Sequence, residues 1–294
     1  MNTFAEPMQA STGTLSCPLC LETGQRNLAE FNGKFLRKCL HCGGRYLFPQ
    51  PSPAELLAHF QTGEADEKEL EGKFESNREN VLSRVADYIQ QRRQRGTILD
   101  VGCATGLFLA RFLQNPGWDA WGLELASASA QKASERGVRI FRGDIHSARF
   151  AENSFDVVSV LDAFYYFPEP HRELAEVHRV LRPDGMLVLE LPLATARIWR
   201  TSKALGRLVS GSRRPLLQSS DHLFYFTPKS VAMLLQRSGF QVEDMRPLPG
   251  NRQAHLPRDF AMRAYSLASS LLHRASGANI FLGPRFLVAA TKIS

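Results

Sequence analysis

The sequence has no long hydrophobic run. No stretch approaches the roughly 18 uninterrupted apolar residues that a membrane-spanning helix requires, and Met1 to Ser16 lacks the basic and apolar regions of a secretory signal. The sequence also lacks internal repeats and low-complexity segments. With 44% hydrophobic and 22% charged residues, its 294 residues have no disorder signature. These absences predict a globular protein that stays in the cytoplasm.

A dense basic tract is also missing, and no RNA-binding aromatic motif is present. The net charge of +7 favours an anionic partner such as RNA, a phosphorylated substrate or a lipid headgroup. Its basic residues are spread in short groups at 92–95, 197–207 and 213–214. That spread favours a solvated surface over a nucleic-acid site. Nucleic acid is therefore an allowed partner that the sequence does not favour.

Cysteines are few, and four of the five fall in two C-x2-C pairs, Cys17 with Cys20 and Cys39 with Cys42. In a reducing compartment such pairs indicate a metal rather than disulfides. The spacing is typical of a zinc ribbon, in which two knuckles present four thiolates to one ion. A redox dithiol would need a thioredoxin-like context that residues 1–50 are too short to supply. We therefore expect a closed, structural Zn²⁺ site.

The chain divides into three parts. Residues 1–50 form the expected zinc-ribbon module, a helical linker follows at 51–95, and an α/β domain occupies 96–294. In that domain short apolar runs alternate with helical segments, which predicts a Rossmann-like, mostly parallel seven-stranded sheet with helices on both faces. The expected strands are Ile98 to Val101, Ala120 to Leu123, Val138 to Phe141, Phe155 to Leu161, Met186 to Leu191, Phe240 to Met245 and Arg285 to Thr291.

Two stretches, at about 193–220 and 250–284, interrupt this rhythm and are candidate lids over an acceptor pocket. In the second, apolar residues gather on one side of an expected helix. The sequence favours packing of this helix on the domain, with association at a membrane surface as the alternative. Its apolar residues are Phe260, Ala261, Ala264, Tyr265, Leu267, Ala268, Leu271 and Leu272.

The loop from Asp100 to Gly106 joins a strand to a helix and carries the pattern G-x-x-x-G. Glycines allow a sharp turn and close approach of a ligand to the backbone. A dinucleotide enzyme would prefer G-x-G-x-x-G, because its pyrophosphate needs backbone contact at the helix start. Ala104 replaces the middle glycine, which favours an adenosine ligand without phosphates.

Acidic residues follow at the ends of successive strands. Glu124 stands 24 positions after Asp100, where a carboxylate can accept hydrogen bonds from both ribose hydroxyls. Asp144 follows the next strand and suits the adenine amino group. Asp156, then Leu161 with Asp162, come next, and the turn from Val180 to Gly185 leads into a further strand. Such an ordered series is not expected by chance.

Over residues 96–191 these motifs resemble the class I S-adenosylmethionine-dependent methyltransferases. The resemblance implies that the loop frames the methionine end of S-adenosylmethionine, that Glu124 binds ribose and that Asp144 with Ile145 lines the adenine. The cofactor-binding residues it implies are Asp100, Gly102, Cys103, Ala104, Gly106, Glu124, Leu125, Asp144, Ile145 and Leu161.

Tyr165 and Tyr166 occupy the positions at which many relatives carry a Glu-His pair. They are expected near the methyl group, where rings or hydroxyls can contact a sulfonium, although a packing role is an equal alternative. His222 is a candidate base or a packing residue. It precedes Thr227 and Pro228, which suit the N-cap and first position of a helix ending at Gly239.

The motifs do not identify the molecule that accepts the methyl group. The zinc segment also resembles that of bacterial methyltransferases acting on sugars or natural products, and of certain ribosomal RNA methyltransferases. We expect methylation of an oxygen, nitrogen or carbon of a small or sugar-linked molecule, with an RNA methyltransferase as the first alternative. A non-catalytic binding protein is the second, and the intact set Asp100, Glu124 and Asp144 argues against it.

Overall fold

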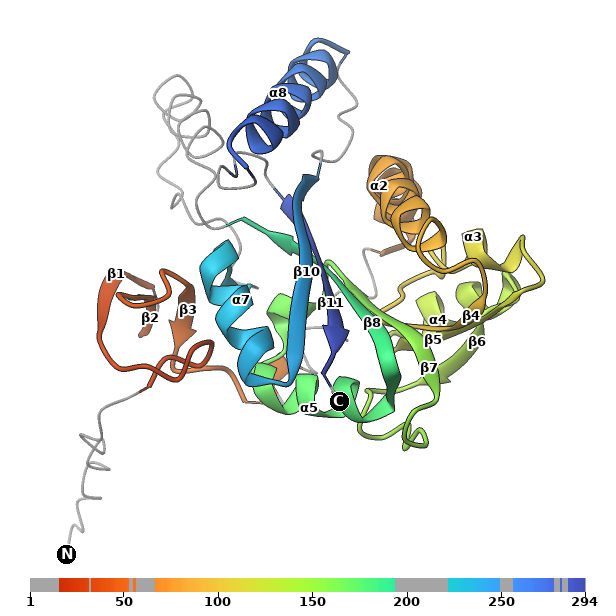
Figure 1. Ribbon diagram of the computed structural model, residues 1–294, viewed down its shortest axis with the longest axis horizontal. Helices are drawn as coiled ribbons and strands as arrows, with labels where there is room; N and C mark the ends of the chain where they lie inside the picture. Colours follow the sequence, from red (N-terminus) through yellow and green to blue (C-terminus); the bar gives the residue numbers. More distant parts are fainter. Residues whose placement is uncertain are drawn as a thin grey trace, which may run out of the picture.

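A seven-stranded sheet forms the main body of the protein (Figure 1). The computed structural model describes residues 16–31, 33–52, 55–56, 67–193, 222–248, 256–277, 281 and 285–293. In spatial order the strands are β10 (Phe240–Leu248), β11 (Arg285–Lys292), β8 (Leu181–Pro192), β7 (Phe155–Leu161), β4 (Gly96–Val101), β5 (Trp118–Glu124) and β6 (Arg139–Arg142). The seven strands lie where the sequence predicts them.

This strand order places a topological switch at β4. From β4 the chain adds β5 and β6 on one side, then returns to add β7 and β8 on the other, all in parallel register. The last strand, β11, is antiparallel to both β8 and β10. In such sheets ligands bind at the carboxyl ends of the strands beside the switch. The loops after β4, β5, β6 and β7 therefore form the edge to search.

Two helical layers cover the sheet, because β8 alternates its buried side chains between them. Leu187 and Leu189 face α5 (Pro170–Val180) and α7 (Pro228–Arg237), whereas Met186 and Val188 face the other side. That side is covered by α2 (Glu67–Gln90), α3 (Ala110–Leu113) and α4 (Ser127–Glu135). The helices expected on both faces are thus confirmed.

A second, four-stranded sheet contains the cysteine module. Its strands are β1 (Gln25–Phe31), β2 (Lys34–Cys39), β3 (Arg45–Phe48) and β9 (Phe224–Tyr225), in that order. The fourth strand thus comes from a part of the chain about 180 residues after the third, as the pairing of Arg45 with Tyr225 shows. The module is joined to the main domain through this strand.

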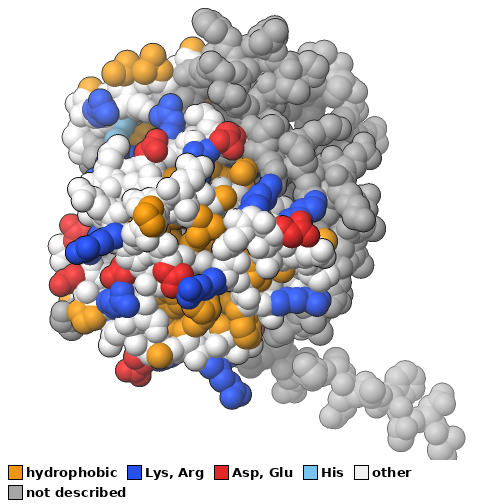
Figure 2. Space-filling view, turned by 90° about the vertical axis from the view of Figure 1, so that its right-hand side faces the viewer, with side chains coloured by type: hydrophobic (Ala, Val, Ile, Leu, Met, Phe, Trp, Pro, Cys, Tyr) orange, Lys and Arg blue, Asp and Glu red, His pale blue; other side chains and the backbone are white. Residues whose placement is uncertain are grey.

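The helix α8 (Leu256–Ala275) turns its polar side toward the domain. Ser269 and His273 are 1% and 7% exposed, and Nε2 of His273 lies 3.0 Å from the carbonyl oxygen of Met245. Leu267, Leu271 and Leu272 are 63%, 57% and 45% exposed. Figure 2 shows hydrophobic side chains gathered at the top of the molecule, where α8 lies. The expectation that these leucines pack on the domain is therefore wrong.

The first interrupting stretch falls almost wholly at 194–221, outside the described residues, and in the second stretch residues 250–255, 278–280 and 282–284 also lie outside them. The lid role expected for both stays a prediction. Among the helices that the structure describes, none has the length and hydrophobicity of a membrane span.

Candidate functional site

The loop after β4 is a tight turn with three left-handed residues. Gly102, Ala104 and Gly106 have φ values of 77°, 48° and 74°. A Cβ on Gly102 would lie 3.0 Å from the Cβ of Ala163, and one on Gly106 would lie 2.8 Å from that of Ala133. Larger residues at either glycine would be both strained and crowded. The turn thus brings bare backbone to the edge of the sheet.

Glu124 closes this turn from the end of β5. Its Oε2 accepts a 2.8 Å hydrogen bond from the backbone N–H of Ala104. Its Oε1 accepts bonds of 2.8 and 2.9 Å from the N–H groups of Leu125 and Ala126. These bonds hold the carboxylate against the loop while Oε2 keeps accepting capacity for a further donor. A ribose hydroxyl fits that capacity.

Asp100 and Cys103 support the loop from beneath, with 3% and 5% exposure. Oδ1 of Asp100 accepts a 2.6 Å hydrogen bond from the hydroxyl of Ser159. Burial nevertheless raises the pKa of Asp100 to about 7. The Cys103 thiol packs on Gly122, where a Cβ would meet its sulfur at 2.5 Å. Both side chains shape the loop from the protein side.

The remaining expected cofactor residues differ in exposure. Asp144 is exposed, and its Oδ1 accepts a 2.7 Å bond from the N–H of Ser147. Partial loss of water around the carboxylate raises its pKa, but the hydrogen bonds from Ser147 outweigh this effect, so the pKa of Asp144 lies below its usual value. Ile145 and Leu161 are buried at 1% and 7%, whereas Leu125 is 43% exposed. Asp144 and Leu125 are the side chains open to a ligand.

Asp156 does not belong to this edge. It is the second residue of β7, so it lies at the opposite end of the strand from Leu161. Its Oδ2 accepts a 2.7 Å bond from the N–H of Thr97 and pairs with Arg182. The expectation that Asp156 is one of the acidic residues of the ligand edge is therefore wrong. Asp156 ties β7 to the start of β4 and to β8.

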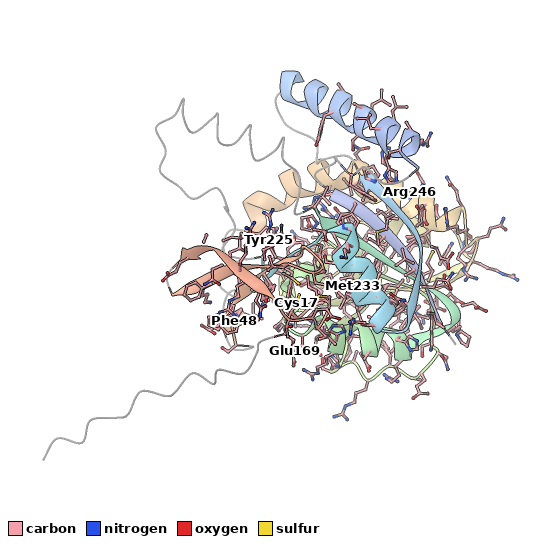
Figure 3. All side chains as sticks on the ribbon, turned by 60° about the vertical axis from the view of Figure 1, so that its left-hand side comes forward. Cys17, Phe48, Glu169, Tyr225, Met233 and Arg246 are labelled. Carbon is pink, nitrogen blue, oxygen red and sulfur yellow. The ribbon has the colours of Figure 1, made fainter. Side chains whose placement is uncertain are left out.

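An aromatic cluster stands at the ligand edge after β7. The short 3-10 helix η1 (Phe164–Tyr166) carries Tyr165 and Tyr166, whose ring centroids are 4.5 Å apart. The His222 ring lies 3.9 Å from that of Tyr165 and 5.8 Å from that of Tyr166. Tyr225 lies 5.7 Å from His222, and Figure 3 shows Tyr225 beside the ribbon strands. The structure thus brings together the three catalytic candidates.

Four charged side chains form a buried network below this cluster. Arg78 on α2 donates to Oδ2 of Asp162 at 2.7 Å and also binds both carboxylate oxygens of Glu190. Arg285 donates to Oδ1 of Asp162 at 2.5 Å and to Oε1 of Glu190 at 2.6 Å. Two positive and two negative groups balance, as buried charges require. This network was not expected from the sequence.

The network fixes the backbone at the end of β7. Asp162 adopts a left-handed φ of 61°, unusual for a residue with a side chain. Both arginines hold its carboxylate, which keeps its pKa below the usual value despite burial. The sequence did contain one signal for the charge network, because Glu190 is a charged residue inside the apolar run of an interior strand.

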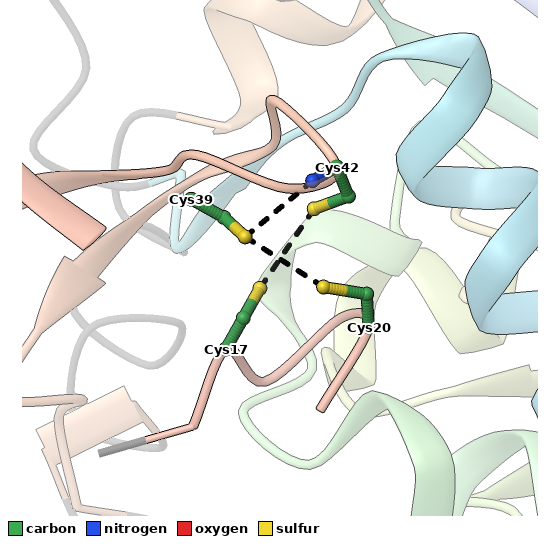
Figure 4. A group of neighbouring side chains, drawn as sticks. All are labelled: Cys17, Cys20, Cys39 and Cys42. Carbon is green, nitrogen blue, oxygen red and sulfur yellow. Dashed lines mark hydrogen bonds between the residues drawn. The ribbon is translucent and has the colours of Figure 1, made fainter. Parts of the chain in front are cut away.

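The four cysteines of the ribbon meet at one point (Figure 4). Their sulfur atoms all lie within 4.8 Å of one another and are buried, with Cys17 and Cys42 at 3.9 Å and Cys20 and Cys39 at 3.6 Å. A tetrahedron of Zn–S bonds of about 2.3 Å has sulfur atoms about 3.8 Å apart. The donor set therefore fits a structural zinc ion.

The strand order and the left-handed turn after β4 define a Rossmann-like protein with a tight turn at the switch of its sheet. A family model described as a methyltransferase domain matches residues 74–244. It covers more than half of the chain, and the chain belongs to this methyltransferase family.

Curated relatives agree with that family. The phthiotriol/phenolphthiotriol dimycocerosates methyltransferase of Mycobacterium leprae is 34% identical over 158 residues, 50% of this chain and 57% of the relative. The nocamycin O-methyltransferase of Saccharothrix syringae is 36% identical over 143 residues, 45% and 49% of the two chains. The chain thus spans about half the length of the curated relatives it matches.

The crystal structure of a SAM-dependent methyltransferase from Thermotoga maritima superposes with a TM-score of 0.53 at 17% identity. It covers 79% of this chain and 99% of that one. At this identity the likeness shows the fold alone.

Proposed function

We propose that this protein transfers a methyl group from S-adenosylmethionine to a small-molecule acceptor. The observation that carries the proposal is the Glu124 carboxylate held against the left-handed loop of residues 102–106, at the switch of a methyltransferase-family sheet. S-adenosylmethionine supplies a methyl group on an activated sulfonium. The chain's own residues have to align the acceptor and take its proton.

The aromatic cluster suits the second task. The Tyr165 hydroxyl donates a 2.7 Å hydrogen bond to Asp162, and the residue is only 3% exposed. The hydroxyl is therefore already engaged by a protein partner. Burial raises the pKa of Tyr165 above its usual value, so its hydroxyl stays protonated at neutral pH and cannot take the proton of the acceptor. The ring faces of Tyr165 and Tyr166 are suited to contact the positively charged sulfonium of the cofactor. We assign the proton-accepting role to His222, because histidine is the side chain that most often serves as a general base.

The acceptor we propose is a hydroxyl group of an apolar or sugar-linked molecule. The matched relatives named above include a dimycocerosates methyltransferase and an O-methyltransferase, and a ubiquinone biosynthesis O-methyltransferase is 28% identical over 166 residues. Nitrogen and carbon acceptors, and RNA, are the alternatives. Salt-sensitive binding of RNA would favour the nucleic-acid alternative.

The test is methyl transfer itself. Protein purified with zinc is incubated with S-adenosylmethionine carrying a radioactive methyl group and a panel of phenols, quinols, hydroxylated lipids and sugar conjugates. Label in an acceptor, lost in His222→Ala, supports the proposal. Label in RNA alone would replace the acceptor class, and cofactor binding without transfer to any class would favour a non-catalytic binding protein.

We propose that the cysteine cluster holds one structural Zn²⁺. Accepting a hydrogen bond from Cys42 lowers the pKa of Cys17 to about 5. None of the four thiols forms a disulfide, which fits a metal site in a reducing compartment such as the cytoplasm. Elemental analysis should find about one zinc per chain, falling on Cys39→Ser. A folded protein without zinc would refute the site.

Association with an anionic lipid surface is a further proposal, and the exposed leucines of α8 support it. Arg274, one turn from Leu271 on the same helix, is exposed. Helices that lie in a membrane interface typically combine an apolar stripe with basic residues. Such a surface would present an apolar acceptor to the enzyme.

We also propose the three-part division into a ribbon module at 1–50, a helical linker at 51–95 and a methyltransferase domain at 96–294. The stretches 193–220 and 250–284 are the proposed insertions. Limited proteolysis should cut at these boundaries first.

A further inference from the structure

Backbone hydrogen bonds run from the ribbon to the aromatic cluster. The N–H of Leu47, on β3, donates to the carbonyl oxygen of Leu223 at 3.0 Å. The N–H of Leu223 donates in turn to the carbonyl oxygen of Tyr165 at 3.0 Å. The residue that follows His222 is therefore clamped between the ribbon and η1. The position of His222 depends on both.

A second connection starts at a cysteine. The hydroxyl of Thr227 donates to the carbonyl oxygen of Cys42 at 2.8 Å and accepts from the N–H of Ser230 at 3.0 Å. Gly44 lies so close to α7 that a Cβ would meet the Cβ of Ser230 at 3.1 Å. The cap of α7 thus rests directly on the second knuckle.

The segment between these two connections is β9 with its neighbours. Phe224 and Phe226 are fully buried, and Phe226 forms a bridge to Leu193 just beyond β8. Tyr225, which contacts His222, pairs with Arg45 of β3. The ribbon therefore lies behind one side of the aromatic cluster.

The cofactor loop is held differently. The N–H groups of Gly102 and Cys103 donate to the carbonyl oxygen of Leu123, and that of Ala104 donates to Glu124. These partners belong to β5 in the main sheet. The cofactor side and the His222 side of the edge thus have separate supports.

We propose that the ribbon is the rear wall of the acceptor site: its metal-bound knuckles position His222 and Tyr225 against Tyr165, so metal binding governs the acceptor side and leaves the cofactor side unaffected. This inference rests on the proposed function, because the acceptor is the substrate of the proposed methyl transfer. Ribbons of this size derive their folding free energy from the metal, because their cores are too small to fold alone. Loss of zinc should free β9 before it disturbs β4 or β5.

The experiment compares the full-length protein with zinc and after chelation. Backbone hydrogen exchange is followed at 222–227 and at 98–101, and S-adenosylhomocysteine binding is measured by calorimetry. Thr227→Val removes the hydroxyl bonded to Cys42, Thr227→Ser keeps it, and Arg237→Gln breaks an exposed contact between α7 and Glu22 of the ribbon. Arg237→Gln is the matched control because its ion pair lies off the connections described.

On zinc removal we expect exchange at 222–227 to rise at least about tenfold while exchange at 98–101 stays constant. The dissociation constant of S-adenosylhomocysteine should change by less than about threefold. Thr227→Val should reproduce part of the rise, and Thr227→Ser and Arg237→Gln should not. Unchanged exchange at 222–227 would overturn the proposal. So would an equal rise in exchange at 222–227 and at 98–101 together with loss of ligand binding. Failure of zinc-loaded wild type to bind the ligand would instead refute the proposed function.

Discussion

The hydroxyl of Tyr165 donates a 2.7 Å hydrogen bond to Oδ1 of Asp162, three residues earlier in the chain. The same carboxylate is held by Arg78 and Arg285, and it lies at a left-handed turn directly after β7. The orientation of Tyr165 at the candidate acceptor site is thus set from α2 and β11. A tyrosine so bound serves through its ring rather than through proton transfer.

The charge network predicts a large cost for removing one arginine. Arg78→Met should lower the free energy of unfolding by about 3 kcal/mol or more, because Glu190 and Asp162 would be left with one arginine between them in a buried site. Urea unfolding measures the change. Arg172→Met, which breaks an exposed pair with Glu169, should cost less than about 1 kcal/mol. Equal costs would show that the network is not buried as described.

Asp100 predicts a dependence of stability on pH. Its pKa is raised to about 7 in the folded state, against about 4 when unfolded. Between these values the folded state binds the proton more tightly, so the contribution of Asp100 to the free energy of unfolding is largest at low pH. It declines by up to about 1.4 kcal/mol per pH unit as the pH rises from 4 to 7.

Asp100→Asn removes this titration. The unfolding free energy of wild type minus that of the variant should therefore fall between pH 4 and 7 and level off above. Ser159→Ala removes the hydrogen bond that lowers the pKa of Asp100, and it should move the end of the decline to higher pH. A difference independent of pH would contradict the burial of this carboxyl group.

The exposed leucines of α8 predict binding to vesicles. A Leu267→Gln/Leu271→Gln variant should bind phosphatidylcholine vesicles containing phosphatidylglycerol at least about tenfold more weakly than wild type, since burial of each leucine contributes about 2 kcal/mol. Co-sedimentation measures the binding, which should also weaken with salt. Leu40→Gln, which alters a 61% exposed leucine of the ribbon, should bind as wild type does. Equal binding by all three proteins would refute the lipid surface.

Much of the main sheet was predictable because parallel strands buried on both faces appear as continuous apolar runs. The runs at β4 and β7 are of this kind, and each has an aspartate at or just after its end, Asp100 and Asp162. The helix α7 was equally clear, since Thr227 caps it, Pro228 begins it and Gly239 follows it with a φ of 81°. Local signals of this type need no knowledge of distant partners.

Other features depend on distant contacts. Nothing in the residues 224–225 indicates that they complete the sheet of a ribbon about 180 positions earlier. Glu190 signals a buried charge in the sequence, but its partners Arg78 and Arg285 lie 112 and 95 residues away. Asp156 was misplaced because an acidic residue near a strand does not show which end of the strand it occupies.

The most direct test of the central claim is calorimetric titration of S-adenosylhomocysteine into three zinc-loaded proteins: wild type, Gly102→Arg and Gly137→Arg. Gly102 and Gly137 both have left-handed backbones, at 77° and 88°, but Gly137 follows α4 at the opposite edge of the sheet. We predict saturable binding of one ligand per chain to wild type and to Gly137→Arg, and none to Gly102→Arg. No binding to wild type, or binding that Gly102→Arg leaves intact, would contradict the cofactor site at the loop of residues 100–106.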